Sequence, residues 1–395
     1  MKKILIVGSG FLQSFIIKKA KEMGLYTIAL DKNNNAIGFK YADEHYCIDI
    51  VNEYECLKVA KQLNIDGVVT GATDYGVLST SFISEKMNLP GLAYKTTELI
   101  KDKHKVRSLL STANINDVKQ FYTVDKMSNF KNISRQLKYP VMIKPIDGSG
   151  SRGAYKVNEE KDFIEFSKLS IENSAKGVAL VEDFIEGREY GVESFVYGGK
   201  VYVLSILGKI MTDHPNYAEL GHYTISDKSV EFKIKKKVEQ IINVLEIDYG
   251  SVNMDVIVDE QNNVSVIDIG VRMGGNLIGS HIIPLSTGFP YIENIIRASL
   301  GEKIDTHFAK NRKEVATRVI ALKPGEIKKI PNISEIEKEY NVNILHTLKE
   351  GKFINEYQNN LDGLGYIISS SKNVQEAMLK NEKALQVLNK KIIRK

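Results

Sequence analysis

Two aspartates in a strand–turn–strand pattern are the first candidates for chemistry in this 395-residue chain. Val, Ile and Met alternate with smaller or polar residues on both sides of the polar segment 259–263, which predicts a β-hairpin. A four-residue loop at 260–263 would pair Asp255 with Asp268 and place both carboxylates on one largely apolar face. Two like charges there resist desolvation, so we expect a Mg²⁺ ion that also keeps water and phosphate oxygens as ligands.

The same hairpin leaves a second interpretation open. A five-residue loop would shift the register by one residue and send Asp255 and Asp268 to opposite faces of the sheet. Arg272, just beyond the second aspartate, carries a planar guanidinium suited to a carboxylate or a phosphate in either case.

A lysine strand followed by a glycine-rich loop is the second candidate. Residues 139–145 (YPVMIKP) read as a short apolar strand, and Lys144 near its end can reach phosphates as a point charge. The loop after it is rich in backbone N–H groups that can surround a polyphosphate, although a plain surface loop fits equally well. The spacing is not that of a Walker loop. The candidate loop residues are Gly148, Ser149, Gly150, Ser151 and Gly153.

An acidic segment follows the apolar run 178–181, which predicts a buried strand. Its functional interpretation is an adenosine slot, with backbone groups between Glu182 and Ile185 at the adenine edge and a carboxylate at the ribose; solvated acids are the alternative. A polar loop farther on is the candidate for substrate contact, although such histidines are more often structural. Its residues are His214, Glu219 and His222.

Residues 3–110 alternate strand-like and helix-like segments, which predicts βαβ units on a parallel sheet. The first turn, 8–13 (GSGFLQ), resembles part of a dinucleotide fingerprint, but Gln13 replaces the third glycine. Asp31 stands at about the right distance to hold a ribose, so an NAD-dependent oxidoreductase is a competing function; a simple tight turn fits the same residues. Residues 96–110 predict one basic helix opened by a threonine cap.

Composition limits the class of protein. The chain is 43% hydrophobic and 26% charged, and its net charge of +5 gives no broad one-signed field. The basic runs 233–237 and 390–395 lack interleaved aromatics and read as solvated helix faces, so we expect no nucleic-acid partner. Two cysteines indicate neither a disulfide framework nor a zinc site. The low cysteine usage therefore predicts a reducing, cytoplasmic compartment. Because no apolar run approaches ~18 residues, we expect no membrane partner.

Taken together and in order, these parts resemble the ATP-grasp superfamily, of the carboxylate-amine ligase type. The resemblance extends to L-amino-acid ligases, biotin-carboxylase-like enzymes and purine-pathway enzymes, and it spans roughly residues 100–300. The motifs that carry it are Lys103, the strand around Lys144, the loop 148–153, the segment 181–189, and the set Asp255, Asp268 and Arg272.

The resemblance implies a site for ATP. Lys103 and Lys144 would contact the phosphates, and the glycine loop would close over them. Glu182 and Ile185 would define the adenine slot, while Glu189 would hold the ribose.

The resemblance also implies Mg²⁺, for which Mn²⁺ can substitute, at Asp255 and Asp268. Arg272 would hold the carboxylate substrate or its phosphorylated intermediate. The chain departs from the commoner pattern because both metal carboxylates are Asp and because Gly270 stands where an Asn ligand is usual.

The expected fold class is mixed α/β and α+β, in several domains. Residues 1–95 would form a Rossmann-like pre-ATP-grasp domain, 96–311 the ATP-grasp domain with a lid at about 112–182, and 312–395 a small C-terminal α+β domain. The predicted reaction joins a small-molecule carboxylate to an amine through an acyl phosphate, with release of ADP and phosphate. The alternatives are a purine-pathway enzyme that activates bicarbonate or formate, and the NAD-dependent oxidoreductase. A homodimer is the expected assembly.

Overall fold

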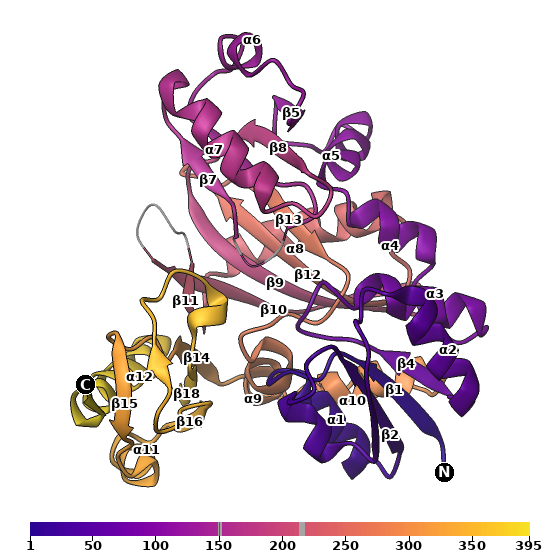
Figure 1. Ribbon diagram of the computed structural model, residues 1–395, viewed down its shortest axis with the longest axis vertical. Helices are drawn as coiled ribbons and strands as arrows, with labels where there is room; N and C mark the ends of the chain where they lie inside the picture. The colour runs from indigo at the N-terminus through magenta and orange to yellow at the C-terminus, as the bar shows by residue number, and fades with distance from the viewer. Residues whose placement is uncertain (149, 151, 213–217) are drawn as a thin grey trace.

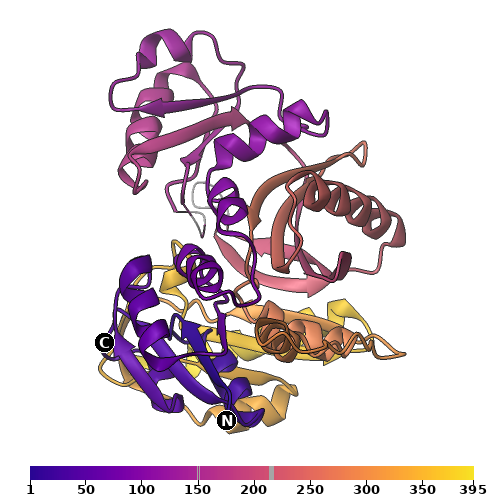
Figure 2. The same cartoon turned by 90° about the vertical axis from the view of Figure 1, so that its right-hand side faces the viewer.

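The protein is described here by a computed structural model, which covers residues 1–148, 150, 152–212 and 218–395. In Figure 1 the indigo N-terminal part and the yellow C-terminal part lie at one end, and the magenta segment stands at the other. Figure 2, turned by 90°, shows the same separation. The long strands between the two ends connect them.

The N-terminal part is built on a four-stranded sheet with the order β3-β2-β1-β4, and all of its pairings are parallel. The predicted βαβ pattern is therefore confirmed. The strands are β1 (Lys3–Val7), β2 (Tyr26–Asp31), β3 (Glu44–Cys47) and β4 (Gly67–Val69). The helices are α1 (Ser14–Glu22), the 3₁₀ turn η1 (Ile37–Tyr41), α2 (Glu53–Leu63) and α3 (Val77–Lys86).

The basic segment 96–110 is not one helix. It is divided between α4 (Tyr94–Ile100) and α5 (Lys103–Thr112), so the prediction of a single helix with a threonine cap is wrong. Asp102 takes an extended conformation, and its side chain accepts a hydrogen bond from the backbone N–H of Lys105. This N-cap starts a new helix at Lys103, whose side chain then lies at the helix end nearest the central cavity.

A separate antiparallel sheet forms the end seen in magenta in Figure 1, with the order β5-β8-β6-β7. It positions Lys144 on β6 beside the acidic end of β8. Its elements are β5 (Phe121–Asp125), α6 (Phe130–Ser134), β6 (Val141–Pro145), β7 (Tyr155–Val157), α7 (Glu160–Glu172) and β8 (Val178–Asp183).

An eight-stranded sheet with the order β13-β12-β9-β10-β11-β14-β18-β16 forms the centre of the molecule. Its first members are β9 (Arg188–Tyr197), β10 (Lys200–Met211), β11 (Glu219–Thr224), β12 (Gly250–Val258) and β13 (Val264–Gly270). The helices beside it are α8 (Lys228–Val244), the π-turn η2 (Ile278–Ile282), α9 (Ile283–Thr287) and α10 (Tyr291–Ser299). The basic run 233–237 lies within α8, as predicted for a helix face.

The C-terminal part continues this sheet. Tyr223 on β11 pairs with Ala316 on β14, so the sheet crosses the predicted boundary at 311/312. The domain limits stay predictions. The elements are β14 (Glu314–Val319), β15 (Gly325–Lys329), α11 (Ile333–Tyr340), β16 (Asn343–His346), β17 (Phe353–Ile354), η3 (Asn360–Asp362), β18 (Gly365–Ser371), α12 (Val374–Lys391) and β19 (Ile393–Arg394).

The hairpin of β12 and β13 combines both of the expected registers. Its loop has five residues, 259–263, so the four-residue loop is wrong. Val256 pairs with Val266, but Asp255 still pairs with Asp268, because a β-bulge leaves Ile267 as one extra residue. The bulge corrects the shift that the longer loop introduces, and the two aspartates lie opposite each other.

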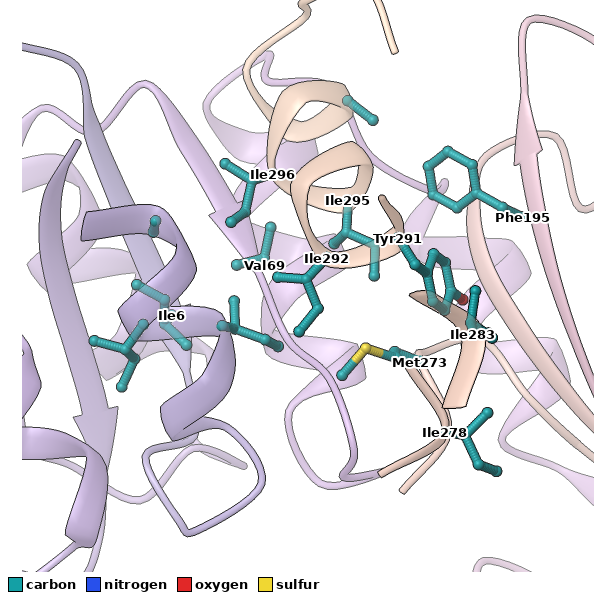
Figure 3. Close-up of a cluster of buried hydrophobic side chains, with 14 of the residues drawn as sticks. Ile6, Val69, Phe195, Met273, Ile278, Ile283, Tyr291, Ile292, Ile295 and Ile296 are labelled. Atoms are coloured by element: carbon teal, nitrogen blue, oxygen red, sulfur yellow. The ribbon is translucent and has the colours of Figure 1, made fainter. Parts of the chain in front are cut away.

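A buried apolar cluster holds the N-terminal part against the eight-stranded sheet. Figure 3 shows Ile6 and Val69 of the parallel sheet facing Ile292 and Ile296 of α10. Met273, directly after β13, completes the contact, and its carbonyl accepts a hydrogen bond from the N–H of Ala72. This packing fixes the loop after β4 next to the end of β13.

Candidate active site

One cavity of about 800 Å³ lies between the N-terminal part, the β5-β8-β6-β7 sheet and the eight-stranded sheet. Nearly all of the described candidate residues line it, including both aspartates, although they are spread over more than 160 positions of the sequence. Gly153 is not among the lining residues, and Ser149, Ser151 and His214 lie outside the described residues. The lining candidates are Lys103, Lys144, Gly148, Gly150, Glu182, Ile185, Glu189, Glu219, His222, Asp255, Asp268 and Arg272.

The paired aspartates are each held by a lysine. Lys103 forms an ion pair with Asp268, and the ammonium group of Lys209 lies 2.7 Å from Asp255 Oδ1. Burial alone would raise the pKa of Asp268, but the charges of Lys103 and Lys144 outweigh it and lower this pKa to about 2. Burial raises the pKa of Asp255 to about 7, against the charge of Lys209.

This arrangement fits a hard divalent cation. Two carboxylates on adjacent strands face one cavity, and ammonium groups take the place of a cation beside each of them. Mg²⁺ usually uses one or two carboxylates and completes its shell with water and phosphate oxygens. No group of three or more His, Cys, Asp or Glu side chains suited to a metal occurs within the described ranges. Asp255 and Asp268 are the residues that would hold such an ion.

Lys209 is a residue of the cavity that the sequence analysis did not single out as a candidate. It is only 2% exposed, and its ammonium group lies 2.7–2.8 Å from the carboxylates of Glu189, Glu219 and Asp255, which come from three other strands. Although burial opposes it, the attraction of these carboxylates raises the pKa of Lys209 well above its ordinary value. A lysine close to the end of β10, after the mainly apolar run 201–207, was the available signal.

Lys144 and Arg107 enclose Glu182. Lys144 Nζ lies 2.7 Å from Glu182 Oε1, and Arg107 Nε lies 2.8 Å from Glu182 Oε2. Burial would raise the pKa of this carboxyl, but the two cations lower it to about 2. Lys144 also donates to the bulged carbonyl of Ile267 at 2.6 Å. The bulge therefore helps to orient Lys144. Arg107, which lies four residues after Lys103 on α5, is a second residue that the sequence analysis missed.

Arg272 is held by a carboxylate from the N-terminal part. Its guanidinium makes a two-pronged contact with Asp74, at 3.2 and 2.9 Å, and a third hydrogen bond of 3.1 Å to Asn253 Oδ1. A Cβ added at Gly270 would lie 3.2 Å from Asp74 Oδ1 and 3.3 Å from Arg272 Cζ. The ion pair thus fills the space beside Gly270. Asp74 follows a parallel strand at its carboxyl end, the usual edge for functional residues.

A buried carboxylate supports Arg272 from behind. Glu193 accepts hydrogen bonds from Tyr291 Oη at 2.6 Å, from the N–H of Gly274 and from Asn253 Nδ2 at 2.9 Å. Because the Asn253 amide donates to Glu193, its oxygen points to Arg272. Burial raises the pKa of Glu193 to about 7, although all of these donors oppose the shift.

The raised pKa of Glu193 makes stability depend on pH. The folded pKa of about 7 lies above the ordinary value of 4.5, so stability from the protonated form is complete below pH 4.5 and is lost as pH rises through 7. We expect Glu193→Gln to remove this dependence. The free energy of unfolding of the variant, relative to that of the native protein, should therefore rise by up to about 3 kcal/mol between pH 4.5 and 8. Urea unfolding at several pH values measures the difference. If the difference in free energy of unfolding between the variant and the native protein did not change with pH, the raised pKa of Glu193 would be contradicted.

Glu219 and His222 lie together on β11. Glu219 Oε1 contacts Lys209, and Asn276 donates to Glu219 Oε2. His222 is buried, with Nε2 at 3.9 Å from Glu219 Oε1, and burial lowers its pKa to about 4, so the ring is neutral at pH 7. Its Nδ1 has no hydrogen-bond partner among the described residues. A neutral imidazole at the cavity wall is suited to accept or donate a hydrogen bond.

The residues of the dinucleotide-like turn are used within the N-terminal part. Asp31 accepts hydrogen bonds from the backbone N–H groups of Ser9 and Asn33, each at 2.9 Å. Gln13 Nε2 donates to the carbonyl of Gly71 at 2.7 Å. These contacts favour the interpretation of a tight structural turn.

Gly150 and Arg152, two described residues of the glycine-rich segment, line the cavity. Gly150 has φ +66°, a conformation that other residues rarely adopt. Arg152 of this loop hydrogen-bonds the hydroxyl of Tyr75, next to Asp74. Arg152 therefore connects its side of the cavity to the wall that carries Tyr75.

Residues 137–280, which include strands of both the β5-β8-β6-β7 sheet and the eight-stranded sheet, match the ATP-grasp domain family. This match and the fold shared with solved structures confirm the sequence resemblance and the mixed α/β multidomain fold class.

Three known proteins illustrate the similarity. The solved phosphoribosylglycinamide synthetase from Anaerococcus prevotii is 28% identical, with each chain covered in full and a TM-score of 0.79. The solved L-amino acid ligase from Bacillus licheniformis is 21% identical over 98% of each chain, with a TM-score of 0.84. The carbamoyl phosphate synthase large chain of Caldanaerobacter subterraneus subsp. tengcongensis is 23% identical over 76% of this chain.

The chain spans 29% of the length of that synthase chain and 48% of the length of the formate-dependent phosphoribosylglycinamide formyltransferase of Prochlorococcus marinus subsp. pastoris, to which it is 30% identical. Within the described parts of the chain, no helix is both long and apolar enough to cross a membrane.

Proposed function

We propose that the protein is an ATP-dependent carboxylate-amine ligase that forms an amide bond through an acyl phosphate. The observation that carries the proposal is the pairing of Asp255 with Asp268 at one wall of the cavity, with Lys103 and Lys144 beside them. Carboxylates for Mg²⁺ and cations for phosphates thus face the same space. ATP and Mg²⁺ are the co-substrate and cofactor of ATP-grasp enzymes; use of Mn²⁺ stays a prediction.

The reaction has two balanced steps. A carboxylate oxygen of the substrate attacks the γ-phosphorus of ATP, and the bond from that phosphorus to the β,γ-bridging oxygen breaks, which releases ADP. The amine lone pair then attacks the acyl carbon, the carbon–oxygen bond to phosphate breaks, and the nitrogen loses a proton. When bound, Mg²⁺ neutralises the phosphate oxygens.

The residues of the chain supply positioning and charge. Lys144 and Lys103 would leave their carboxylate partners in part to contact phosphate oxygens, and Arg272 would hold the substrate carboxylate. Glu189 would accept the ribose hydroxyls, and Ile185 would meet the adenine. The glycine-rich loop would exclude water, since an acyl phosphate otherwise hydrolyses.

A purine-pathway type of reaction remains the second candidate. The observation that favours it is the full-length similarity to the structure described as phosphoribosylglycinamide synthetase. In this alternative the same nucleotide site would activate bicarbonate or formate, or would serve a ribonucleotide amine. A homodimer remains the proposed assembly.

The test is ADP release from ATP and Mg²⁺ with a panel of carboxylates and amines. The proposal expects ADP only when a carboxylate and an amine are both present. ADP that requires bicarbonate or formate with a ribonucleotide amine would favour the second candidate. Tight NADH binding without ATP binding would contradict both.

A further inference from the structure

The end of the cavity beyond Glu219 is built partly from the C-terminal part of the chain. Asn359, Asn360 and Leu361 line the cavity there, together with Tyr366. In Figure 1 the gold stretch that leads into β18 lies beside β11. The C-terminal part therefore contributes a wall to the cavity.

The turn that carries these residues is fixed by its own hydrogen bonds. The Asn359 side chain accepts from the N–H of Leu361 at 3.0 Å, and the Asp362 carboxylate accepts from the N–H of Asn359 at 3.0 Å. This reciprocal capping satisfies the exposed backbone donors at the start of η3. The side chain of Leu361 is therefore presented from a defined backbone.

The same turn is tied to Glu219. The hydroxyl of Tyr357 donates to the backbone carbonyl of Glu219 at 2.5 Å, and Asn360 Nδ2 donates to Glu219 Oε2 at 3.3 Å. Tyr366 Oη donates to Asn276, whose amide in turn donates to Glu219. The carboxylate thus anchors the C-terminal wall and is not left as a free acceptor for a ligand.

This wall presents apolar side chains to the cavity. Leu361 is 77% exposed although it belongs to an otherwise polar turn, and it lines the cavity. Leu12, from the first turn of the chain, also lines the cavity and packs in one cluster with Tyr357 and Tyr366. Two leucines from opposite ends of the sequence therefore border the same end of the cavity.

The side chains at this end of the cavity do not suit a phosphorylated ligand. Among the described residues, the cation that contacts Glu219 directly is Lys209, which is buried and shared by three carboxylates. The other contacts of Glu219 come from amides and a hydroxyl. A phosphate group needs arginine, lysine or a cluster of free N–H groups, whereas the cavity-lining residues of this wall are amides, a tyrosine and leucines.

We propose that Leu361 and Leu12 form the specificity end of the substrate site and receive an uncharged aliphatic group of the carboxylate or amine substrate. The inference rests on the proposed ligase function and selects aliphatic substrates, such as amino acids with branched side chains, over phosphorylated ribosyl compounds.

The test is Leu361→Ala, measured by ADP release with glycine, alanine, leucine and a ribonucleotide amine in turn. We expect kcat/KM for leucine to fall on the order of tenfold, mainly through KM, while the values for glycine and the KM for ATP stay unchanged. The control is Leu379→Ala on α12, a leucine that is 54% exposed and does not line the cavity. It should leave all of these constants unchanged.

Two outcomes would overturn the inference. The first is that the substrate with the highest kcat/KM carries a phosphorylated ribosyl group, or that Leu361→Ala lowers kcat/KM equally for every substrate. ADP release would then still support the ligase function. The other is that the aliphatic compounds give neither ADP nor a shift of Tm with Mg²⁺ and a non-hydrolysable ATP analogue. Absence of ADP with every pair of the panel would contradict the ligase function itself.

Discussion

Asp268→Asn is expected to abolish ADP formation and to leave the fold intact. The change removes one of the two carboxylates that face the cavity and lowers the charge available to a divalent cation. We expect kcat to fall at least on the order of 100-fold, and Mg²⁺ added at higher concentration to restore only part of it. Steady-state ADP release across a Mg²⁺ series measures both effects.

The control for this variant is Asp248→Asn. Asp248 is exposed in the connection between α8 and β12, so the same chemical change occurs away from the cavity. Activity should not change, and circular dichroism of both variants should match the native protein. Near-normal turnover of Asp268→Asn would refute its metal role.

Arg272→Ala is expected to reduce both activity and stability. Arg272 and Asp74 are 16% and 15% exposed, and removal of the guanidinium leaves Asp74 as an uncompensated, largely buried charge. We expect a loss of about 3 kcal/mol in the free energy of unfolding. ADP formation should fall on the order of 100- to 1000-fold, because the group that faces the substrate carboxylate is gone.

A double variant separates the two effects. In Asp74→Ala/Arg272→Ala neither charge is left alone, so part of the stability should return while activity stays low. Arg297→Ala is the matched control, since Arg297 forms an ion pair with Glu293 on the surface of α10 and should cost at most about 1 kcal/mol. If the double variant also regained activity, Arg272 would act through stability alone.

The sequence allowed the hairpin and the paired aspartates to be predicted, because alternation along a strand determines which side chains share a face. It could not supply the loop length, since the bulge at Ile267 compensates for the extra turn residue only in three dimensions. The glycine loop was likewise recognisable from composition alone.

The partners of the charged residues could not be predicted. Lys209, Arg107 and Asp74 each contact carboxylates or cations from elements far away in the sequence, and no local pattern records such pairs. The break at Asp102 was missed for another reason. Its capping aspartate was visible, but the apolar and basic pattern continued through it.

The continuous sheet has a mechanical consequence. Because β14 pairs with β11, the C-terminal wall cannot swing away from the floor of the cavity without breaking backbone hydrogen bonds. In the described residues, no strand of the β5-β8-β6-β7 sheet pairs with the eight-stranded sheet, and Lys144 and Arg107 bridge the two through side chains. We therefore expect the exchange of substrates to involve a movement of the β5-β8-β6-β7 sheet, in which the hydrogen bonds of Lys144 and Arg107 to β13 would break.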